Sequence, residues 1–360
     1  MSAAGFEIEW ISEEERFAAI AAEWDALLPA DSSPFDLHCW YELWWRAFGG
    51  TRKLAVCTVW RDGKLSAALP LADHRGRLQG MVNGHSGFYR ALHADPESLQ
   101  ALCAAALARS SPEIQVSALP SEDPSLQGLV AAAREGSRLA LSEPGYTSPI
   151  VETSGEFQAW FKGEHKSWKG RIARYRRKIE REHEAKLEIV VAPDDLDAWL
   201  DEGFRLEASG WKGEAGTAIE SNPDTASFYR ELARTFHERE ALRLSRIVLD
   251  GTDVAFSFCL QHGERLYSLK VGYDESLKKV VPGLIMQLAI VERCFELDLE
   301  AYELLGDEND WKRKVSTATR EHTDLRIYPR TPAGAGHHFY RRRLRPLLKR
   351  TYRRVRPAKR

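Results

Sequence analysis

Cysteine is scarce in this sequence, and no motif organises it into a metal or redox site. The 360 residues include five cysteines, an odd and widely spaced set with no CxxC pair. No Cys/His cluster has the spacing of zinc ligands. We therefore expect no bound metal and no disulfide framework, and we expect the thiols to be small buried side chains in a reducing compartment.

Membrane-targeting features are missing as well. The N-terminus lacks the basic and apolar regions of a signal peptide. The longest apolar run, at 102–107, falls far short of the ~20 residues that span a bilayer. There is also no P-loop, Rossmann fingerprint, HExxH or Ser-His-Asp order, which argues against nucleotide triphosphatases, zinc proteases and common hydrolases. We expect a cytoplasmic protein, at most peripheral to the inner membrane face.

Acidic residues are absent from the end of the chain. Residues 337–360 include 11 Lys/Arg and no Asp/Glu, which leaves 40 basic and 53 acidic residues in the rest. Such a basic tail favours an anionic partner, either a membrane or a nucleic acid. A disordered solubilising tail is the alternative.

The length favours two domains, and one pattern of elements occurs twice. Asp62-Gly63 and Asp250-Gly251 each separate two apolar runs, which is typical of a hairpin, and each hairpin leads on to a helix and a last strand. We predict an α+β fold of two similar domains, each a mixed and mostly antiparallel sheet flanked by helices. The predicted domains are 1–150 and 151–332, followed by the tail 333–360. The expected helices are 13–28, 37–48, 98–108, 156–162, 167–182, 227–239 and 282–297, and the expected strands are 53–60, 65–71, 113–119, 242–249, 254–261, 266–273 and 302–305.

Several segments carry a family resemblance. They are Leu206–Gly213, Gly216–Ile219, Leu269–Glu275 with Val281–Leu284, and Gly306–Glu308 with Trp311 and Lys312, together with the early Ser33, Pro34, Phe35, Trp40, Trp44, Trp45 and Phe48. Residues 30–330 thereby resemble the CelD/BcsL-like (cellulose-biosynthesis-type) branch of the GNAT superfamily, which is related to the FemABX peptidyltransferases. The resemblance implies paired GNAT-like domains, the second active and the first degenerate, that use acetyl-CoA or another acyl-CoA. Val281 stands where the family tends to have Ser, and Trp311 where it tends to have Tyr.

The turn at 281–284 is the expected cofactor-binding segment. Pro282 suits the first position of a helix, and Gly283 allows close approach of the backbone. The N–H groups of Gly283, Leu284 and Ile285 would face a diphosphate, with the helix dipole behind them. An ordinary helix that begins at proline is the alternative. The other expected cofactor contacts are Lys270, Val271 and Gly272 at the strand edge and Lys312 at the phosphates.

Three carboxylates are candidates for the base that deprotonates the acyl acceptor. Asp307 and Asp274 each close a strand, and Glu207 lies on a helix; we favour Asp307 or Glu207. Asp274 and Asp307 could equally serve as turn formers or helix caps. The expected acceptor contacts are Trp211, Lys212, Tyr273 and Trp311.

Three functions are compatible with the sequence. The first is acyl-CoA-dependent transfer to an amine or hydroxyl of a small molecule, a sugar nucleotide or an envelope-glycan precursor. The second is a FemABX-like transferase that uses aminoacyl-tRNA, for which the cationic face of helix 167–182 and the basic tail would contact RNA. The third is a non-catalytic binding protein of an exopolysaccharide system.

Overall fold

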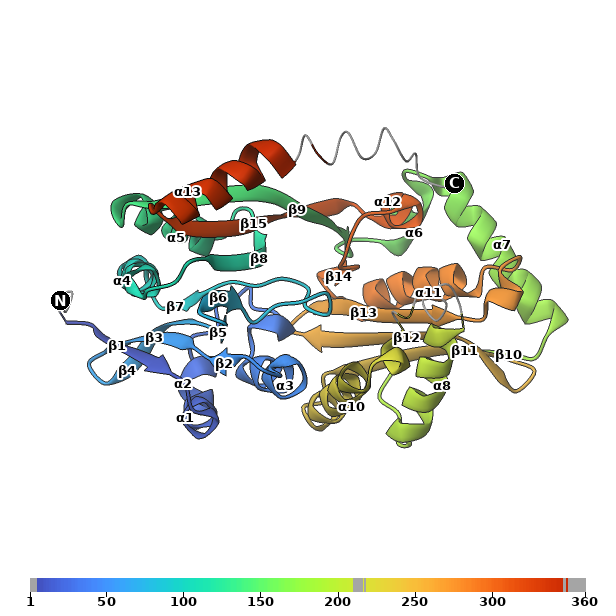
Figure 1. Ribbon diagram of the computed structural model, residues 1–360. Coiled ribbons are helices and arrows are strands. Elements are labelled where there is room, and N and C mark those ends of the chain that lie inside the picture. Colours follow the sequence, from blue (N-terminus) through green and yellow to red (C-terminus); the bar gives the residue numbers. More distant parts are fainter. Residues whose placement is uncertain (1–4, 210–215, 217, 346–347, 349–360) are drawn as a thin grey trace.

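The computed structural model describes residues 5–209, 216, 218–345 and 348. It contains an α+β fold in which helices flank two sheets, a four-stranded antiparallel one and an 11-stranded mixed one (Figure 1). The strands are β1 (Glu7–Ile11), β2 (Lys53–Leu54), β3 (Val56–Arg61), β4 (Lys64–Leu69), β5 (Leu71–His74), β6 (Arg77–Gly80), β7 (Leu92–His93), β8 (Ile114–Pro120), β9 (Arg138–Glu152), β10 (Ala185–Val191), β11 (Leu242–Leu249), β12 (Thr252–His262), β13 (Arg265–Tyr273), β14 (Ala301–Glu303) and β15 (Ala318–Pro329).

The helices are named on the same scheme. They are α1 (Glu14–Ala19), α2 (Ala21–Asp25), α3 (His38–Phe48), α4 (Pro96–Ala108), α5 (Pro124–Glu135), α6 (Phe157–Lys162), α7 (Lys166–Glu182), α8 (Leu196–Ala208), α10 (Pro223–Glu238), α11 (Pro282–Glu296), α12 (Asp310–Val315) and α13 (Pro332–Phe339). Short 3-10 turns lie at η1 (Pro34–Asp36), η2 (Ile219–Ser221) and η3 (Glu275–Leu277), and a π-helical turn, η4 (Tyr340–Leu344), continues α13.

The predicted internal repeat is present. In the first half, β1, a helical segment, α3, a hairpin, β6, α4 and β8 follow one another, and β10, α8, α10, a hairpin, β13, α11 and β14 repeat that order in the second half. The two Asp-Gly turns hold the hairpins β3–β4 and β11–β12. Asp62, Gly63, Asp250 and Gly251 all have positive φ, between 50° and 79°, as a two-residue hairpin turn with this twist requires.

The final strand of each half pairs with the sheet of the other half. β9 ends the first half and lies antiparallel to β14, whereas β15 ends the second half and lies antiparallel to β8. β9 and β15 also pair with each other, so one 11-stranded sheet of order β10-β11-β12-β13-β14-β9-β15-β8-β6-β5-β2 runs through both halves. The boundary predicted near residue 150 therefore falls inside β9, which takes part in both halves.

Helices cover both faces of the second-half strands. α8 and α10 lie on one face and α11 on the other (Figure 1). Gly272 of β13 allows α8 to come very close, because a Cβ atom at this position would lie 2.5 Å from the backbone N of Glu207. The same face carries the buried Phe204 and Phe256.

Replacing Gly272 with alanine is therefore expected to destabilise the protein by about 1–3 kcal/mol, because the added methyl meets backbone that must shift. Urea denaturation measures the change. Gly170→Ala in α7 is the matched control, since its Cβ would meet nothing within 4 Å and alanine favours a helix by about 0.5–1 kcal/mol. Equal effects of the two substitutions would contradict the proposed close approach.

Two differences from the predicted elements have local causes. The helix expected over 13–28 is divided into α1 and α2 at Ile20, whose φ and ψ of −98° and 12° leave the helical region. Strand β10 and the long strands β9 and β15 were not predicted, because their sequences mix charged and apolar residues without a clean alternation.

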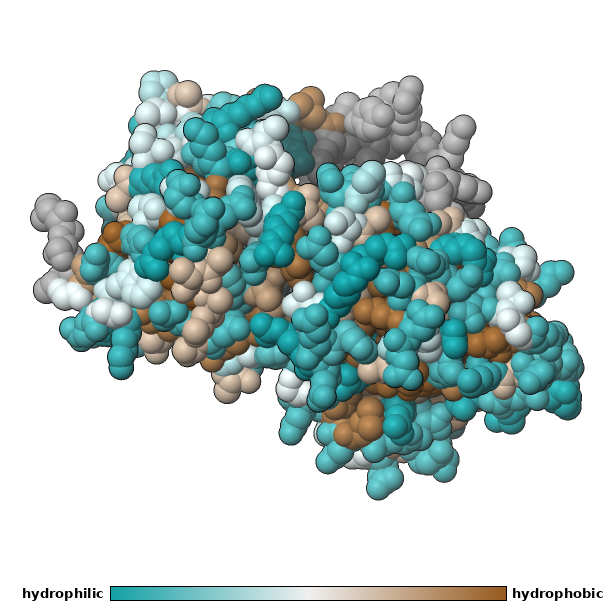
Figure 2. All heavy atoms as spheres, turned by 90° about the horizontal axis from the view of Figure 1, so that it is seen from below, coloured by the Kyte–Doolittle hydropathy of each residue, from teal (hydrophilic) through white to brown (hydrophobic). Residues whose placement is uncertain are grey.

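The surface and the cysteines follow the composition. None of the helices in the described ranges is long and apolar enough to cross a bilayer. The face in Figure 2 is mostly hydrophilic, with hydrophobic side chains in small separate groups. All five cysteines are free thiols and four are buried; burial raises the pKa of Cys57 and Cys103 to about 12, which makes them poor nucleophiles.

Candidate functional site

Strands β13 and β14 separate at the centre of the second half. They pair in parallel only over Arg265–Tyr267 and Ala301–Glu303. Beyond Glu303 the chain follows β9 instead, because the Leu304 and Glu308 N–H groups donate to the carbonyls of Pro149 and Thr147 at 3.0 and 3.1 Å. The C-terminal part of β13 therefore faces a cavity where a neighbouring strand would otherwise lie. We call it the splay cavity.

A β-bulge shapes the same part of β13. Phe258 pairs with Lys270 and Cys259 pairs with Ser268, which leaves Leu269 as the extra residue. A bulge increases the local twist of a strand and turns its side chains, and bulges are common beside functional sites. The bulge therefore adds to the departure of β13 from β14.

The N-terminus of α11 lies at the splay cavity. Its N-cap, Val281, has φ 52° and ψ 49°, a left-handed conformation that is unfavourable for a β-branched residue. The Val281 carbonyl accepts from the N–H groups of Leu284 and Ile285 at 3.0 and 3.1 Å. The amides of Leu284 and Ile285, two of the three that we expected to face an anion, are thus bonded within the helix. The third, the amide of Gly283, lies in the first turn, where an N–H group has no carbonyl partner within the helix.

The splay cavity has a volume of about 840 Å³ and is formed by both halves of the chain. The second half contributes β13, the first two turns of α11 and the segment from Leu304 to Lys312. The first half contributes the loop 83–87 and Tyr146 of β9. A cavity of this size is typical of a small-molecule site.

The loop 83–87 brings a neutral histidine to the cavity wall. The His85 ring stacks on Phe48 with centroids 5.3 Å apart, and its Nδ1 lies 3.3 Å from the Tyr229 hydroxyl. Burial, and secondarily the Lys270 ammonium, lower the pKa of His85 to about 4. His85 is therefore uncharged at neutral pH.

Tyr146 is fixed beside this loop. Its hydroxyl donates to the Gly87 carbonyl, and its ring stacks on His322 at 4.2 Å. Burial raises the pKa of Tyr146 well above its usual range and lowers the pKa of His322 to about 4. Both rings therefore stay neutral, and Tyr146 lines the cavity with His322 stacked against it.

Gln287 supplies a buried polar group whose hydrogen bonds are incomplete. It lies one turn beyond Gly283, is 3% exposed and lines the cavity. The Tyr302 hydroxyl donates to its Oε1 at 2.9 Å, while its Nε2 has no partner. If the amide were flipped, the hydroxyl would accept from Nε2 and Oε1 would lack a partner. In either orientation, one polar atom remains for a ligand.

Eight of the predicted site residues come together at this cavity. They are Lys270, Val271, Tyr273, Gly283, Leu284, Asp307, Trp311 and Lys312. The Lys312 ammonium donates to the Leu305 carbonyl, which holds the side chain beneath the turn at Gly306. The roles assigned to these residues from the sequence remain predictions.

Five predicted residues do not line the cavity. Pro282 and Ile285 are buried within the first turn of α11, and Gly272 packs against α8. Glu207 is 2% exposed and accepts from the Ile219 N–H at 2.8 Å, so it anchors the start of η2 to α8. Asp274 accepts from the Ser276 N–H at 2.8 Å and caps η3, the alternative role considered above. Trp211 and Lys212 lie outside the described residues.

His85, Tyr146 and Gln287 were missed in the sequence. Gln287 carries a usable signal, since it is an uncharged polar residue within the apolar run from Leu284 to Val291. His85 lies in a Gly- and Ser-rich loop of the other half, and nothing local connects that loop to β13. Only the fold brings these residues together.

The equivalent space in the first half is filled. β6 pairs in parallel with β8, as β13 pairs with β14. The chain after β6 returns, however, so that the Tyr89 N–H donates to the Ala118 carbonyl of β8 at 3.1 Å. The Tyr89 ring is buried against Gly80, and its hydroxyl donates to the Pro70 carbonyl at 2.7 Å. An acyl arm therefore has no room there.

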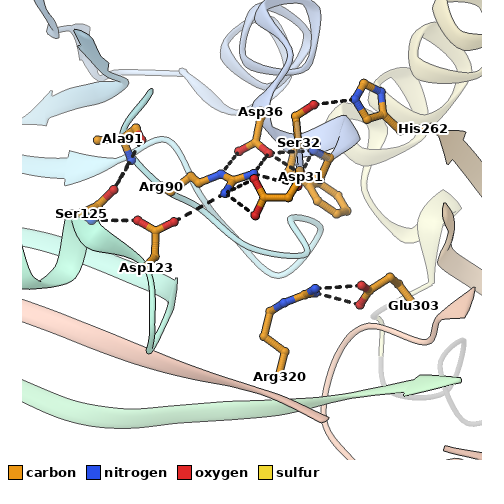
Figure 3. Close-up of polar contacts among 12 residues, drawn as sticks. Asp31, Ser32, Asp36, Arg90, Ala91, Asp123, Ser125, His262, Glu303 and Arg320 are labelled. Carbon is orange, nitrogen blue, oxygen red and sulfur yellow. Dashed lines mark hydrogen bonds and ion pairs between the residues drawn. The ribbon is translucent and has the colours of Figure 1, made fainter. Parts of the chain in front are cut away.

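A second cavity, of about 1070 Å³, lies between the two halves. Figure 3 shows Arg90 surrounded by three carboxylates: Asp36 at 2.9 Å, Asp31 at 3.3 Å and Asp123 at 3.6 Å. Burial lowers the pKa of Arg90, but the carboxylates of Asp36, Asp31 and Asp123 together more than offset this, and the pKa ends above its usual value. These charges satisfy one another, so we assign no ligand to this cavity.

Comparison with known families identifies the central part of the chain. Residues 166–313, which include β13, α11, β14 and Lys312, match a family model described as an acetyltransferase (GNAT) domain. This part therefore carries a GNAT-type acetyltransferase domain. The match and the internal repeat confirm the predicted α+β fold of two GNAT-like units. No curated protein matched the chain.

Several solved structures share the fold. FemX superposes with a TM-score of 0.57 and 12% identity, covering 88% of this chain and 96% of its own. The C-terminal domain of a putative lysylphosphatidylglycerol synthetase from Agrobacterium fabrum superposes with a TM-score of 0.56 and 12% identity, covering 89% of this chain and 93% of its own. L-PGS from Bacillus licheniformis superposes with a TM-score of 0.55 and 11% identity, covering 91% of this chain and 95% of its own. At these identities, the likeness concerns the fold alone.

Proposed function

We propose that the protein is an acyl-CoA-dependent N- or O-acyltransferase, with acetyl-CoA as the simplest donor. The observation that carries the proposal is the splay cavity, which combines separated parallel strands with a helix N-terminus inside the region that matches the GNAT domain. A bound acyl-CoA would supply an activated thioester. We retain the CelD/BcsL-type assignment, with a small amine or an envelope-glycan precursor as acceptor, as part of this proposal.

The diphosphate end of the donor fits the mouth of the cavity at α11. The first-turn amide of Gly283 and the positive end of the helix dipole favour an anion there. Lys278 also lines the cavity, and Lys312 is held near Gly306. The residues present are thus chemically suited to phosphate groups.

The acyl end would lie in the gap between β13 and β14. Gln287 is suited to this end, because one of its amide atoms is buried without a partner and lies at the cavity wall. A hydrogen bond from Nε2 to a ligand carbonyl would satisfy that group and orient the carbonyl for attack.

Gln287→Leu is expected to weaken binding of acetyl-CoA by roughly tenfold, the value of one buried hydrogen bond. Isothermal titration calorimetry measures the affinity. Tyr302→Phe is the matched control, because it removes the neighbouring hydroxyl, which is bonded to Gln287 at 2.9 Å, and leaves the amide in place. Unchanged affinity of the Gln287 variant would remove this residue from the donor site.

The acceptor side is formed by the first half. Attack by an acceptor nitrogen or oxygen forms the new bond to the carbonyl carbon, breaks the bond to sulfur and releases one proton from the acceptor. Asp307 lines the cavity and can accept that proton, and the neutral His85 lines it as an uncharged hydrogen-bonding group. Because His85 and Tyr146 come from the first half, we propose that this half selects the acceptor.

Calorimetry with coenzyme A and acetyl-CoA tests the proposal directly. Saturable binding with a rise in melting temperature is the expected result, since a ligand at a hundred times its Kd stabilises the native state by about 2.7 kcal/mol. If coenzyme A and acetyl-CoA produced no binding heat and no rise in melting temperature, the proposal would be ruled out.

One observation favours the aminoacyl-tRNA alternative. Arg171, Arg174 and Arg177 are exposed on α7, and none of them forms an ion pair with another described residue. Salt-sensitive binding of charged tRNA without binding of coenzyme A would replace the first proposal with this second one.

A further inference from the structure

We infer that the C-terminal helical segment, α13 together with η4, and the nearby Leu348 dock the protein on an anionic lipid surface. The inference does not depend on the chemistry of the splay cavity. It rests on three features of this segment: how one side is fixed, what the other side exposes, and its charge.

One side of the segment is fixed to the body of the protein. Gly334 packs against β15 so closely that a Cβ atom there would lie 2.1 Å from the Pro329 carbonyl oxygen. The ring of His337 stacks on Tyr328 with centroids 6.4 Å apart. Arg341 and Arg345 each lie 3.8 Å from the carboxylate of Glu143 on β9. The helix is thus held along β9 and β15 at one end of the molecule (Figure 1).

The other side exposes large apolar side chains. Four of the seven exposed large hydrophobic residues among those described belong to this segment, although it is a small part of the chain. They are Phe339, Tyr340, Leu344 and Leu348, which are 57%, 45%, 43% and 58% exposed. Tyr340 and Leu344 are spaced four residues apart and so lie on one side of η4. An exposed apolar stripe of this kind marks an interaction surface.

The same segment carries a strong positive charge. Arg342 and Arg343 are exposed and have no ion-pair partner within the described ranges. Residues 337–360 as a whole contain 11 Lys/Arg and no Asp/Glu. The positive charge therefore has no compensating carboxylate nearby in the sequence. Among the described residues, the carboxylate that pairs with this segment is Glu143, which two arginines on the fixed side share.

Apolar and basic groups together distinguish a lipid surface from a nucleic acid. Leucine side chains gain free energy when they enter the boundary between headgroups and acyl chains, and arginines beside them meet anionic headgroups. A nucleic acid backbone would use the arginines and leave Leu344 and Leu348 in water. Stable association needs two such signals, and both are present on one helix.

Vesicle co-sedimentation of the full-length protein tests the inference. We expect binding to phosphatidylcholine vesicles that contain one third phosphatidylglycerol, weakened by salt, and little binding to phosphatidylcholine alone. Arg342→Gln with Arg343→Gln should reduce the partition coefficient by roughly 25-fold, about fivefold for each charge. Phe339→Ser with Leu344→Ser should reduce it as well, and this second result would not follow from charge alone.

Arg171→Gln with Arg174→Gln on α7 is the matched control, because it removes the same charge from an equally exposed helix and should leave vesicle binding unchanged. All the substituted side chains are exposed, so the circular dichroism of each variant should match the parent. Equal loss with the α7 variant, or unchanged vesicle binding by both tail variants, would overturn the inference. If the Arg342→Gln, Arg343→Gln variant lost binding to a short RNA duplex but kept its vesicle binding, the segment would be a nucleic acid surface instead.

Discussion

Leu284→Glu is expected to weaken coenzyme A binding by roughly a hundredfold without reducing stability. Leu284 is partly exposed in the first turn of α11 and lines the splay cavity. A carboxylate there would stand where the proposed diphosphate lies, and two like charges about 4 Å apart near a protein surface repel by up to about 4 kcal/mol. In the free protein, the same carboxylate would interact favourably with the helix dipole.

The opposite signs of these two effects make the test specific. Urea denaturation gives the stability and calorimetry gives the affinity for coenzyme A. Leu284→Gln has nearly the same shape without the charge, so it should retain most of the binding. A glutamate variant that binds as well as the parent would show that the anion lies elsewhere, whereas a glutamine variant as weak as the glutamate variant would assign the loss to packing.

Glu303→Gln is expected to destabilise the protein by about 3 kcal/mol. Glu303 is completely buried at the point where β13 and β14 separate, and Arg320 donates two hydrogen bonds to it at 2.8 and 2.9 Å (Figure 3). Arg265 lies 3.3 Å away on β13. Neutralising the carboxylate leaves two largely buried guanidinium groups without their shared counter-charge, and breaking a buried pair costs about 3–5 kcal/mol.

The lower end of that range applies because the two arginines are 25% and 21% exposed and keep some contact with water. Denaturation at neutral pH measures the effect. Arg313→Gln is the control, since its ion pair with Glu308 at 2.9 Å is exposed and should be worth less than about 1 kcal/mol. Similar losses for the two variants would mean that Glu303 has little structural importance.

Local features were predictable from the sequence. The two Asp-Gly hairpin turns need left-handed residues, and the sequence places suitable residues at both positions. Pro282 begins α11 as predicted, because its ring and missing N–H suit that position. The cofactor side of the site consists of such local elements, so most of its residues could be found.

Features that depend on distant parts of the chain could not be predicted in the same way. The pairing of β9 with β14 joins residues about 150 positions apart, and no local pattern specifies it. His85 meets Tyr229 for the same reason. Glu207 and Asp274 both accept backbone N–H groups, and a carboxylate in such a position is as suitable for that role as for accepting a proton, so a local pattern does not distinguish the two.

The exchange of β9 and β15 between the two halves has a consequence for how this chain can evolve. Tyr89 fills the gap in the first unit, yet the last strand of that unit pairs with β14 of the other. A deletion of either unit would remove a strand from the survivor and expose an unpaired sheet edge. Once duplicated in this arrangement, the two copies depend on each other for folding, and the copy without a cavity of its own still supplies a strand and part of the cavity wall to the other.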